Sequence, residues 1–196
     1  MSETRSRTIE LTDPRALRAV AHPIRLELIG LLRRSGPLTA TQAAARIGES
    51  PASCSFHLRQ LDKYGLVEEA GGGRGRERPW RATATYTSWA VAGGDDDSAE
   101  AAAMLSRVVI ERYLEAAIEW LERRRTEPPE WVEVGDAGDR ILYATPAELQ
   151  DLEKRLSELF DPFVERLSDP SKRPQGARPV NLIQLVLPMP DEPAEE

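Results

Sequence analysis

Four stretches in the first third of the chain carry apolar side chains at the spacing of an amphipathic helix. Asp13 followed by Pro14 is typical of a helix start, and Ser50 followed by Pro51 repeats the same signal. Thr39 supplies a third N-cap residue. The pattern therefore predicts helices over residues 14–21, 23–34, 40–47 and 51–64.

Two strands are predicted next, at residues 66–70 and 80–85, with a glycine- and arginine-rich loop between them. The loop reads Gly71-Gly-Gly-Arg-Gly-Arg-Glu-Arg78. It is either an ordinary hairpin connection or a wing that touches DNA. Three arginines in so short a loop favour the wing, because arginine neutralises phosphate.

The second half begins after a turn at residues 93–98, which is the best candidate for a domain boundary. A long helix is predicted at 98–125, with two adjacent apolar stripes. The first stripe contains Leu105, Val109, Tyr113, Ala117 and Trp120, and the second contains Val108, Leu114, Ile118 and Leu121. Because an apolar face of this width needs more than one neighbour, further packing partners are expected. The remaining predicted elements are short strands at 131–134, 140–144 and 180–187 and an amphipathic helix at 146–167.

The fold class implied by this order is mainly α within the α+β class: an N-terminal winged helix-turn-helix followed by an α+β C-terminal region with two long helices and a few short antiparallel strands. The expected organisation is an N-terminal tail (1–12), a DNA-binding domain (13–92), a C-terminal dimerisation or effector region (93–187) and an acidic tail (188–196). Because the tail is polar and rich in proline, we expect it to be disordered.

Charge is distributed unevenly along the chain. Residues 1–85 contain 14 Lys and Arg against 9 Asp and Glu (+5), whereas residues 86–196 contain 12 against 24 (−12), which gives the net charge of −7. A basic half beside an acidic half indicates that only the first half meets nucleic acid, although two unrelated surfaces would give the same totals.

The sequence gives no sign of a membrane or of an oxidising compartment. No apolar run is long enough to cross a bilayer, and the first residues do not resemble a signal peptide. A single cysteine, Cys54, excludes an internal disulfide and fits a reducing environment. We therefore expect a cytoplasmic protein.

Residues 39–64 have the layout of a DNA-reading helix-turn-helix, in which the second helix lies in the major groove. On that helix Cys54, Leu58 and Leu61 share a face that is expected to pack on the preceding helices. The positions expected away from that face, where they can bond to bases or phosphates, are Ala52, Ser53, Phe56, His57, Gln60 and Lys63. Phe56 is the unusual member, because it would either touch thymine methyl groups or tuck under a neighbouring loop.

Residues 13–85 resemble the winged helix-turn-helix of the ArsR family of bacterial repressors, and MarR-like and PadR-like regulators share parts of the pattern. The matching stretches are Leu17-Arg-Ala-Val-Ala-His-Pro-Ile-Arg-Leu-Glu-Leu-Ile29, Ser53-Cys-Ser-Phe-His-Leu-Arg-Gln-Leu61 and Gly65-Leu-Val-Glu68. The resemblance implies a homodimer, a recognition helix at 51–64 and a wing at 71–79. It also implies that Ser53, Ser55, His57 and Arg59 face DNA, whereas Phe56 departs from the usual basic or polar residue. The DNA-binding candidates are Ser50, Ala52, Ser53, Ser55, Phe56, His57, Arg59, Gln60, Lys63, Arg74, Arg76 and Arg78.

Many ArsR-type repressors sense metals, but we expect no metal site and no cofactor here. The thiolate-rich pattern of such sensors is absent from the third helix, which reads Thr41-Gln-Ala-Ala-Ala-Arg46. Cys54, His22 and His57 are expected on different sides of the domain, and a metal needs three or four converging ligands. An enzyme is not expected either, because the chain has no nucleophile elbow, no phosphate-binding glycine motif and no histidine outside the DNA-binding half.

The sequence thus predicts a homodimeric repressor that occupies a palindromic operator in double-stranded DNA. The helix at 98–125, with the helix at 14–21 as a second candidate, would hold the dimer. In the alternative, both apolar stripes of the long helix are buried within one subunit. Two other functions stay open: a winged-helix assembly module that never touches DNA, and a repressor gated by a small-molecule effector in an apolar C-terminal pocket.

Overall fold

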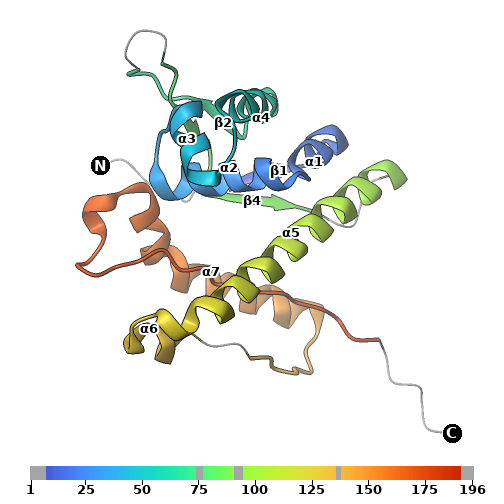
Figure 1. Cartoon of the computed structure of the whole chain (residues 1–196). Helices are drawn as coiled ribbons and strands as arrows, with labels where there is room; N and C mark the ends of the chain where they lie inside the picture. The colour runs from blue at the N-terminus through green and yellow to red at the C-terminus, as the bar shows by residue number, and fades with distance from the viewer. Residues whose placement is uncertain (1–7, 74–76, 91–94, 136–137, 191–196) are drawn as a thin grey trace, which may run out of the picture.

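The computed structural model of the chain describes residues 8–73, 77–90, 95–135 and 138–190. The chain is mainly helical with a few short strands, which confirms the predicted fold class. Figure 1 shows the first four helices gathered at one side of the molecule, with the long helix α5 running diagonally away from them toward α6 and α7. Within the described residues, no helix is long and apolar enough to cross a membrane.

The first four helices form where their capping signals predict. Asp13 accepts a hydrogen bond from the Arg15 backbone N–H at 2.8 Å and so begins α1. Thr39 and Gln42 form a reciprocal capping box at the start of α3, with N···O distances of 2.9 and 3.2 Å. The bounds are α1 (Pro14–Val20), α2 (Pro23–Ser35), α3 (Ala40–Ile47) and α4 (Pro51–Lys63).

A Schellman motif ends α4. The Leu66 N–H donates to the Leu61 carbonyl at 3.1 Å, and the Gly65 N–H donates to the Asp62 carbonyl at 2.9 Å. Gly65 has φ of 69°, a left-handed conformation that favours glycine. The turn directs the chain from α4 into the first strand of the hairpin.

The predicted hairpin is present, and a second strand pair was not predicted. β2 (Val67–Glu69) pairs antiparallel with β3 (Trp80–Ala82), and Leu38 extends this sheet by bonding to Trp80. β1 (Thr8–Leu11) runs parallel to β4 (Tyr86–Trp89). The assignment of residues 1–12 to a tail is therefore wrong for residues 8–11, because their strand partner lies far away in the sequence.

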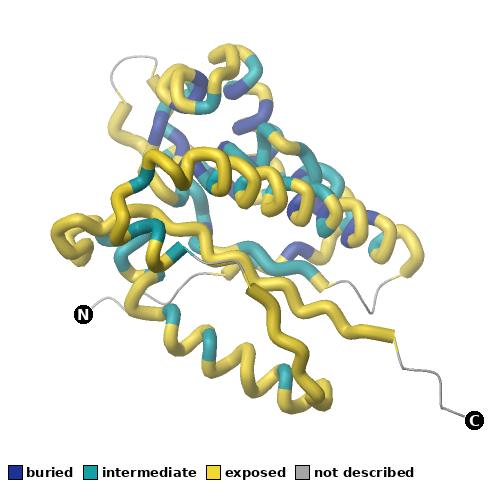
Figure 2. Tube along the Cα trace, turned by 60° about the horizontal axis from the view of Figure 1, so that its bottom comes forward, coloured by how far each residue is buried: buried dark blue, intermediate teal, exposed yellow. Residues whose placement is uncertain are grey.

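The hydrophobic core is confined to residues 11–109 of the described chain. α5 (Asp96–Arg123) contributes four buried residues, all from its first half. Figure 2 shows the contrast, with buried residues at the winged-helix side and exposed backbone through the C-terminal region. The largest fully buried side chains include Leu17, Leu28, Leu32, Leu58, Leu61 and Leu105.

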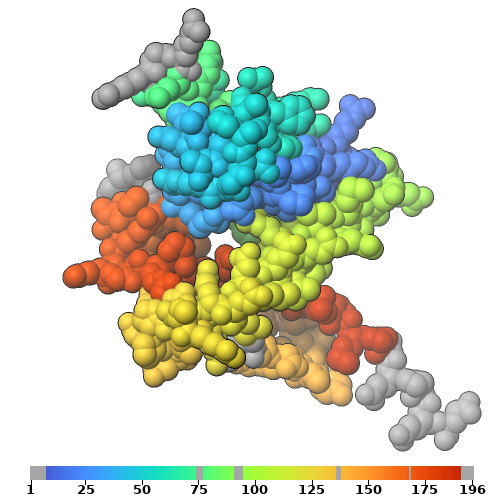
Figure 3. All heavy atoms as spheres, in the orientation of Figure 1, coloured from blue at the N-terminus to red at the C-terminus, as the bar shows by residue number. Residues whose placement is uncertain are grey.

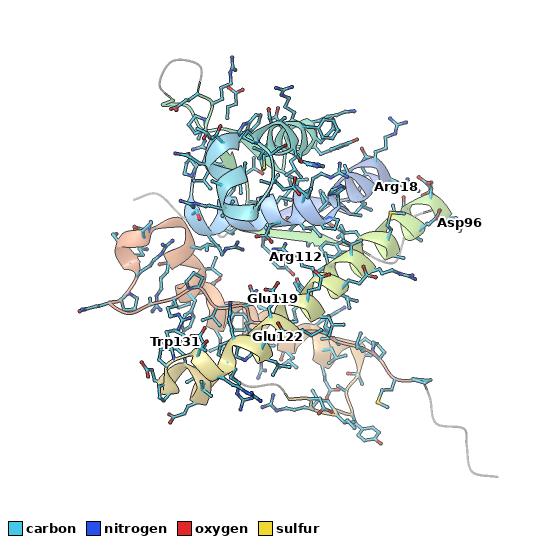
Figure 4. All side chains as sticks on the ribbon, viewed as in Figure 1. Arg18, Asp96, Arg112, Glu119, Glu122 and Trp131 are labelled. Atoms are coloured by element: carbon cyan, nitrogen blue, oxygen red, sulfur yellow. The ribbon has the colours of Figure 1, made fainter. Side chains whose placement is uncertain are left out.

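Polar contacts fix the first half of α5 to the helix-turn-helix. Arg18 of α1 forms an ion pair with Asp97, and Arg112 of α5 forms one with Glu27 of α2 at 2.6 Å. Figure 4 shows Arg18 close to the start of α5 and Arg112 between α5 and the helices above it. α5 is therefore anchored to the first half of the chain at two points, about four turns apart.

The C-terminal region differs from its prediction. The segment expected as a strand at 131–134 lies in α6 (Pro129–Val134), where Pro129 occupies the first helical turn. Segments 140–144 and 180–187 form no strand, since the described residues of this region offer them no ladder partner. The predicted helix is present as α7 (Pro146–Ser168), with its capping box at Thr145 and Glu148. Of the predicted acidic tail, residues 191–196 lie outside the described residues.

Candidate nucleic-acid interface

α4 presents one face to the core and the opposite face to solvent. Cys54, Leu58 and Leu61 are fully buried, as predicted from their spacing. Six positions of α4 are exposed, Pro51 and Asp62 among them, and the other four follow one another at intervals of four, three and four residues, which places those four on a single helix face. They are Ala52, Phe56, Arg59 and Lys63, with Ser53 and Gln60 half-buried beside them. We name this set of six the α4 outer face. The α4 segment lies with the wing strands at the end of the molecule away from α6 and α7 (Figure 3).

The start of α4 and its flank carry the other two serine candidates. Ser50 is exposed, and its Oγ accepts a hydrogen bond from the Ser53 N–H at 3.1 Å. Ser55 is half-buried and accepts a bond from Arg59 Nη2 at 3.1 Å. Arg59 is thus oriented along the helix surface in the free protein.

Phe56 does not tuck under a loop. Its side chain is 56% exposed, and its ring meets the His57 ring edge-on, with centroids 5.2 Å apart. A phenyl ring exposed to this extent gains free energy when a partner covers it. The Phe56 side chain therefore points outward, which leaves contact with thymine methyl groups as the alternative that fits the structure.

His57 is not on the outer face, so this prediction is wrong. The residue is 8% exposed and its ring packs against His22, with centroids 4.6 Å apart. The reason lies in helical periodicity: position 57 is three residues after Cys54 and four before Leu61, on the same face as both. The expectation that the two histidines lie on different sides of the domain is also wrong.

The wing is described in part. Arg74 and Arg76 lie outside the described residues. Arg78 is exposed and forms an ion pair with Glu69 at 2.9 Å, while Arg81 on β3 forms one with Glu68 at 2.8 Å. Arg81 was missed in the sequence, although alternation along the strand after buried Trp80 would have placed it outward.

A half-buried arginine connects α2 to the base of the hairpin. Arg33 Nε donates to the Ala84 carbonyl at 2.9 Å, and Nη2 donates to Thr87 Oγ1 at 2.6 Å. Burial lowers the pKa of Arg33 to about 10, which still leaves it charged at neutral pH. These bonds hold the segment after β3 in a fixed position relative to α2.

The chemistry of the domain is that of binding groups. Burial raises the pKa of the Cys54 thiol, so it stays protonated and unreactive near neutral pH. Across the described ranges, no three or more His, Cys, Asp or Glu side chains come together as a possible metal site. The exposed hydroxyl, amide and guanidinium groups of α4 are instead those that bond to base edges and phosphates.

Comparisons with known proteins identify a helix-turn-helix in the first half of the chain. Residues 20–70 match a family model described as a helix-turn-helix domain. The crystal structure of a MarR family protein from Mycobacterium tuberculosis in complex with salicylic acid matches with 17% identity over 76% of this chain and 87% of that chain, at a TM-score of 0.31. Comparison with curated proteins gave no match. The helix-turn-helix match, together with the outward polar face of α4, supports a DNA-binding transcriptional regulator.

Proposed function

We propose that this protein is a homodimeric, sequence-specific repressor of the ArsR type that binds double-stranded DNA and needs no metal. The observation that carries the proposal is the α4 outer face. It is polar apart from Ala52 and Phe56, and nothing in the described chain covers it. A recognition helix in the major groove needs such a face.

Residues of this interface divide by chemistry. Ser53 and Gln60 can bond to base edges, and Phe56 can contact a thymine methyl group. Arg59 and Lys63 can reach phosphates or guanine. Ser50, Ala52 and Ser55 lie near the start of α4, where they would approach the sugar-phosphate backbone of DNA. In the wing, Arg74, Arg76 and Arg78 contact phosphates or the minor groove. Arg78 would leave its ion pair with Glu69 to bind a phosphate. Breaking that pair costs little free energy, because an exposed ion pair contributes only about 0–1 kcal/mol.

The second half of α5 supplies a surface for a second copy. Ile110, Leu114, Ile118 and Leu121 are exposed and follow one another at helical spacing, so they form one stripe. We call these four residues the α5 stripe. The alternative that both apolar stripes of this helix are buried within one subunit has no support here, since α7 does not cover these four side chains. A contiguous apolar surface of this kind favours association.

The α7 helix extends the same argument. Its exposed Leu152, Leu159 and Phe163 also share one face. Leu156 on the same face and Phe160 beside it are half-buried. α1 is a weaker candidate for the dimer contact, because its apolar residues are already buried within this chain.

Selection of bound fragments from random DNA with the purified full chain tests the proposal. We expect an enriched palindrome whose half-sites lie about one helical turn, 34–36 Å, apart. Absence of any enriched sequence would contradict DNA recognition, and an enriched single half-site would contradict the dimer.

The wing is tested separately through the salt dependence of operator affinity. Replacing Arg74, Arg76 and Arg78 with alanine should weaken binding to every sequence and reduce the salt slope by about 0.9 per lost phosphate contact. The matched control replaces Arg124, Arg125 and Arg140, which removes the same charge from the second half. An unaltered slope in the wing variant would exclude the wing from the interface.

A further inference from the structure

All buried side-chain polar atoms without a hydrogen-bond partner, among the described residues, lie in one place. They are His22 Nδ1, Arg25 Nε and His57 Nδ1. His22 is the N-cap residue of α2 and makes no capping bond with its side chain, while His57 lies on the buried face of α4. Buried polar groups are normally bonded, so three unbonded atoms where α4 meets α2 require an explanation.

The pair is built to remain neutral. Burial is the main cause that lowers the pKa of both histidines, and the Arg25 guanidinium on α2 lowers both further. His22 also lowers the pKa of His57. Glu49, from the turn between α3 and α4, acts in the opposite direction on both rings. Tyr64 at the end of α4 acts on Arg25, not on the rings. One nearby carboxylate thus acts on both imidazoles, against the effects of burial and of the Arg25 guanidinium.

We propose that His22 and His57 form a proton-sensitive latch between α2 and the recognition helix. When both rings are neutral, they pack against each other in a tilted arrangement, with centroids 4.6 Å apart, and hold α4 in its position for DNA. A proton on either ring introduces a charge beside Arg25 while the ring's buried Nδ1 has no hydrogen-bond partner. Water can reach that buried Nδ1 only if the two helices separate, so acidification releases α4 from its DNA-binding position. The effect on DNA rests on the proposed function, whereas the effect on stability does not.

The direction of the pH dependence follows from linkage. An unfolded histidine titrates near 6.5, and both folded values are lower. Below pH about 6.5 the unfolded chain therefore binds more protons than the folded one. The stability of the neutral pair is complete above that pH and is lost as the pH falls toward the folded pKa values.

The test uses the fact that the chain has only two histidines. In the wild-type protein, NMR titration of the two imidazole C–H signals should show both pKa values below 6.5. Between pH 7.5 and 5.5, at constant salt, operator affinity should fall by roughly threefold to tenfold, since one pKa unit corresponds to a tenfold change. The double variant His22→Phe/His57→Leu keeps apolar contact without a titrating ring, and its affinity should change little over this range.

Each outcome decides the proposal. Ordinary histidine pKa values in the folded wild-type chain would overturn the latch without any variant. The same pH dependence of affinity in the wild type and in the double variant would also overturn it. If the protein binds no operator at any pH, the proposed function fails and the free energy of unfolding decides. If acidification lowers the free energy of unfolding more in the wild type than in the double variant, the latch is supported. If it lowers the free energy of unfolding equally in both, the latch is overturned.

Discussion

Residues 8–109 and residues 110–190 both carry clear amphipathic patterns, but the two regions differ in how far their apolar side chains are buried. The first region closes a hydrophobic core within one chain, while the second buries no side chain fully among its described residues. α7 carries one of the clearest amphipathic stripes in the sequence and still leaves Leu159 and Phe163 exposed. The comparison teaches that periodicity identifies an apolar face but does not say whether the same chain covers it.

The boundary between the two regions lies within one helix. Leu105 of α5 is 0% exposed and Leu114, on the opposite side nine positions later, is 61% exposed. The same substitution at Leu105 and at Leu114 therefore compares the effect of one chemical change in a buried and in an exposed environment.

The largest effect is expected at the α5 stripe. Leu114→Asp together with Ile118→Asp should convert a dimer to folded monomers, because four apolar side chains, two from each protomer, lose their cover. At about 1.5–3 kcal/mol for each fully covered side chain, the loss is roughly 6–12 kcal/mol of association free energy. Sedimentation measures the mass, and helical content by circular dichroism reports folding.

The control for that variant is Glu115→Asp with Glu119→Asp, which places aspartates elsewhere on α5 and should remain dimeric. If the wild-type protein sediments as a monomer and still binds its operator tightly, the dimeric mechanism is wrong. Val109 is unsuitable for this test, since it is buried at 9% exposure and its replacement would damage the core.

A leucine pair measures the difference between the two regions directly. Leu105→Ala should lower the free energy of unfolding by about 2–5 kcal/mol, the range for a buried leucine. Leu114→Ala should change it by about 0.5 kcal/mol or less when measured on the monomer. Urea unfolding at a protein concentration below dimer dissociation provides both values. Equal losses would mean that the second half of α5 is covered within its own chain.

The α4 outer face should give a smaller, base-specific effect. Gln60→Ala or Phe56→Ala should change the preferred base at one or two operator positions, with a loss of about 1–3 kcal/mol at each. Lys63→Ala is the control, because a phosphate contact should weaken all sequences alike. Binding to a set of single-base operator variants distinguishes the two patterns. Unchanged preference in both test variants would show that this face does not read bases.

Two helix caps give the smallest expected effect. Ser50→Ala should lower the free energy of unfolding by about 1 kcal/mol, since α4 belongs to the core and loses its cap. Thr145→Ala removes a cap from α7, and its effect on unfolding of the core should be close to zero. Thermal unfolding of both variants at low protein concentration measures the difference, and equal shifts would contradict the division into two regions.

The sequence predicted the elements whose causes are local. Caps at Asp13, Thr39 and Ser50 and the periodicity of apolar residues predicted α1–α5 and α7. β1 and β4 were missed because their pairing joins two short segments from distant parts of the chain. The prediction of a strand at 131–134 was wrong, because Pro129 favours a helix start and the β-branched side chains that follow did not prevent the helix. The error at His57 was avoidable, since its spacing from Cys54 and Leu61 marks the buried face.

The length of α5 has a geometric consequence. Its 28 residues span about 42 Å, and its first half is fixed to the helix-turn-helix by Leu105 and by the Arg18–Asp97 pair. In a dimer paired through the α5 stripe, each such helix is a rigid arm with a recognition helix at its far end. A rotation of a few degrees at the pairing point would then shift the two recognition helices by several ångströms. In such a dimer, the separation of half-sites would be set by a pairing contact that lies far from any base.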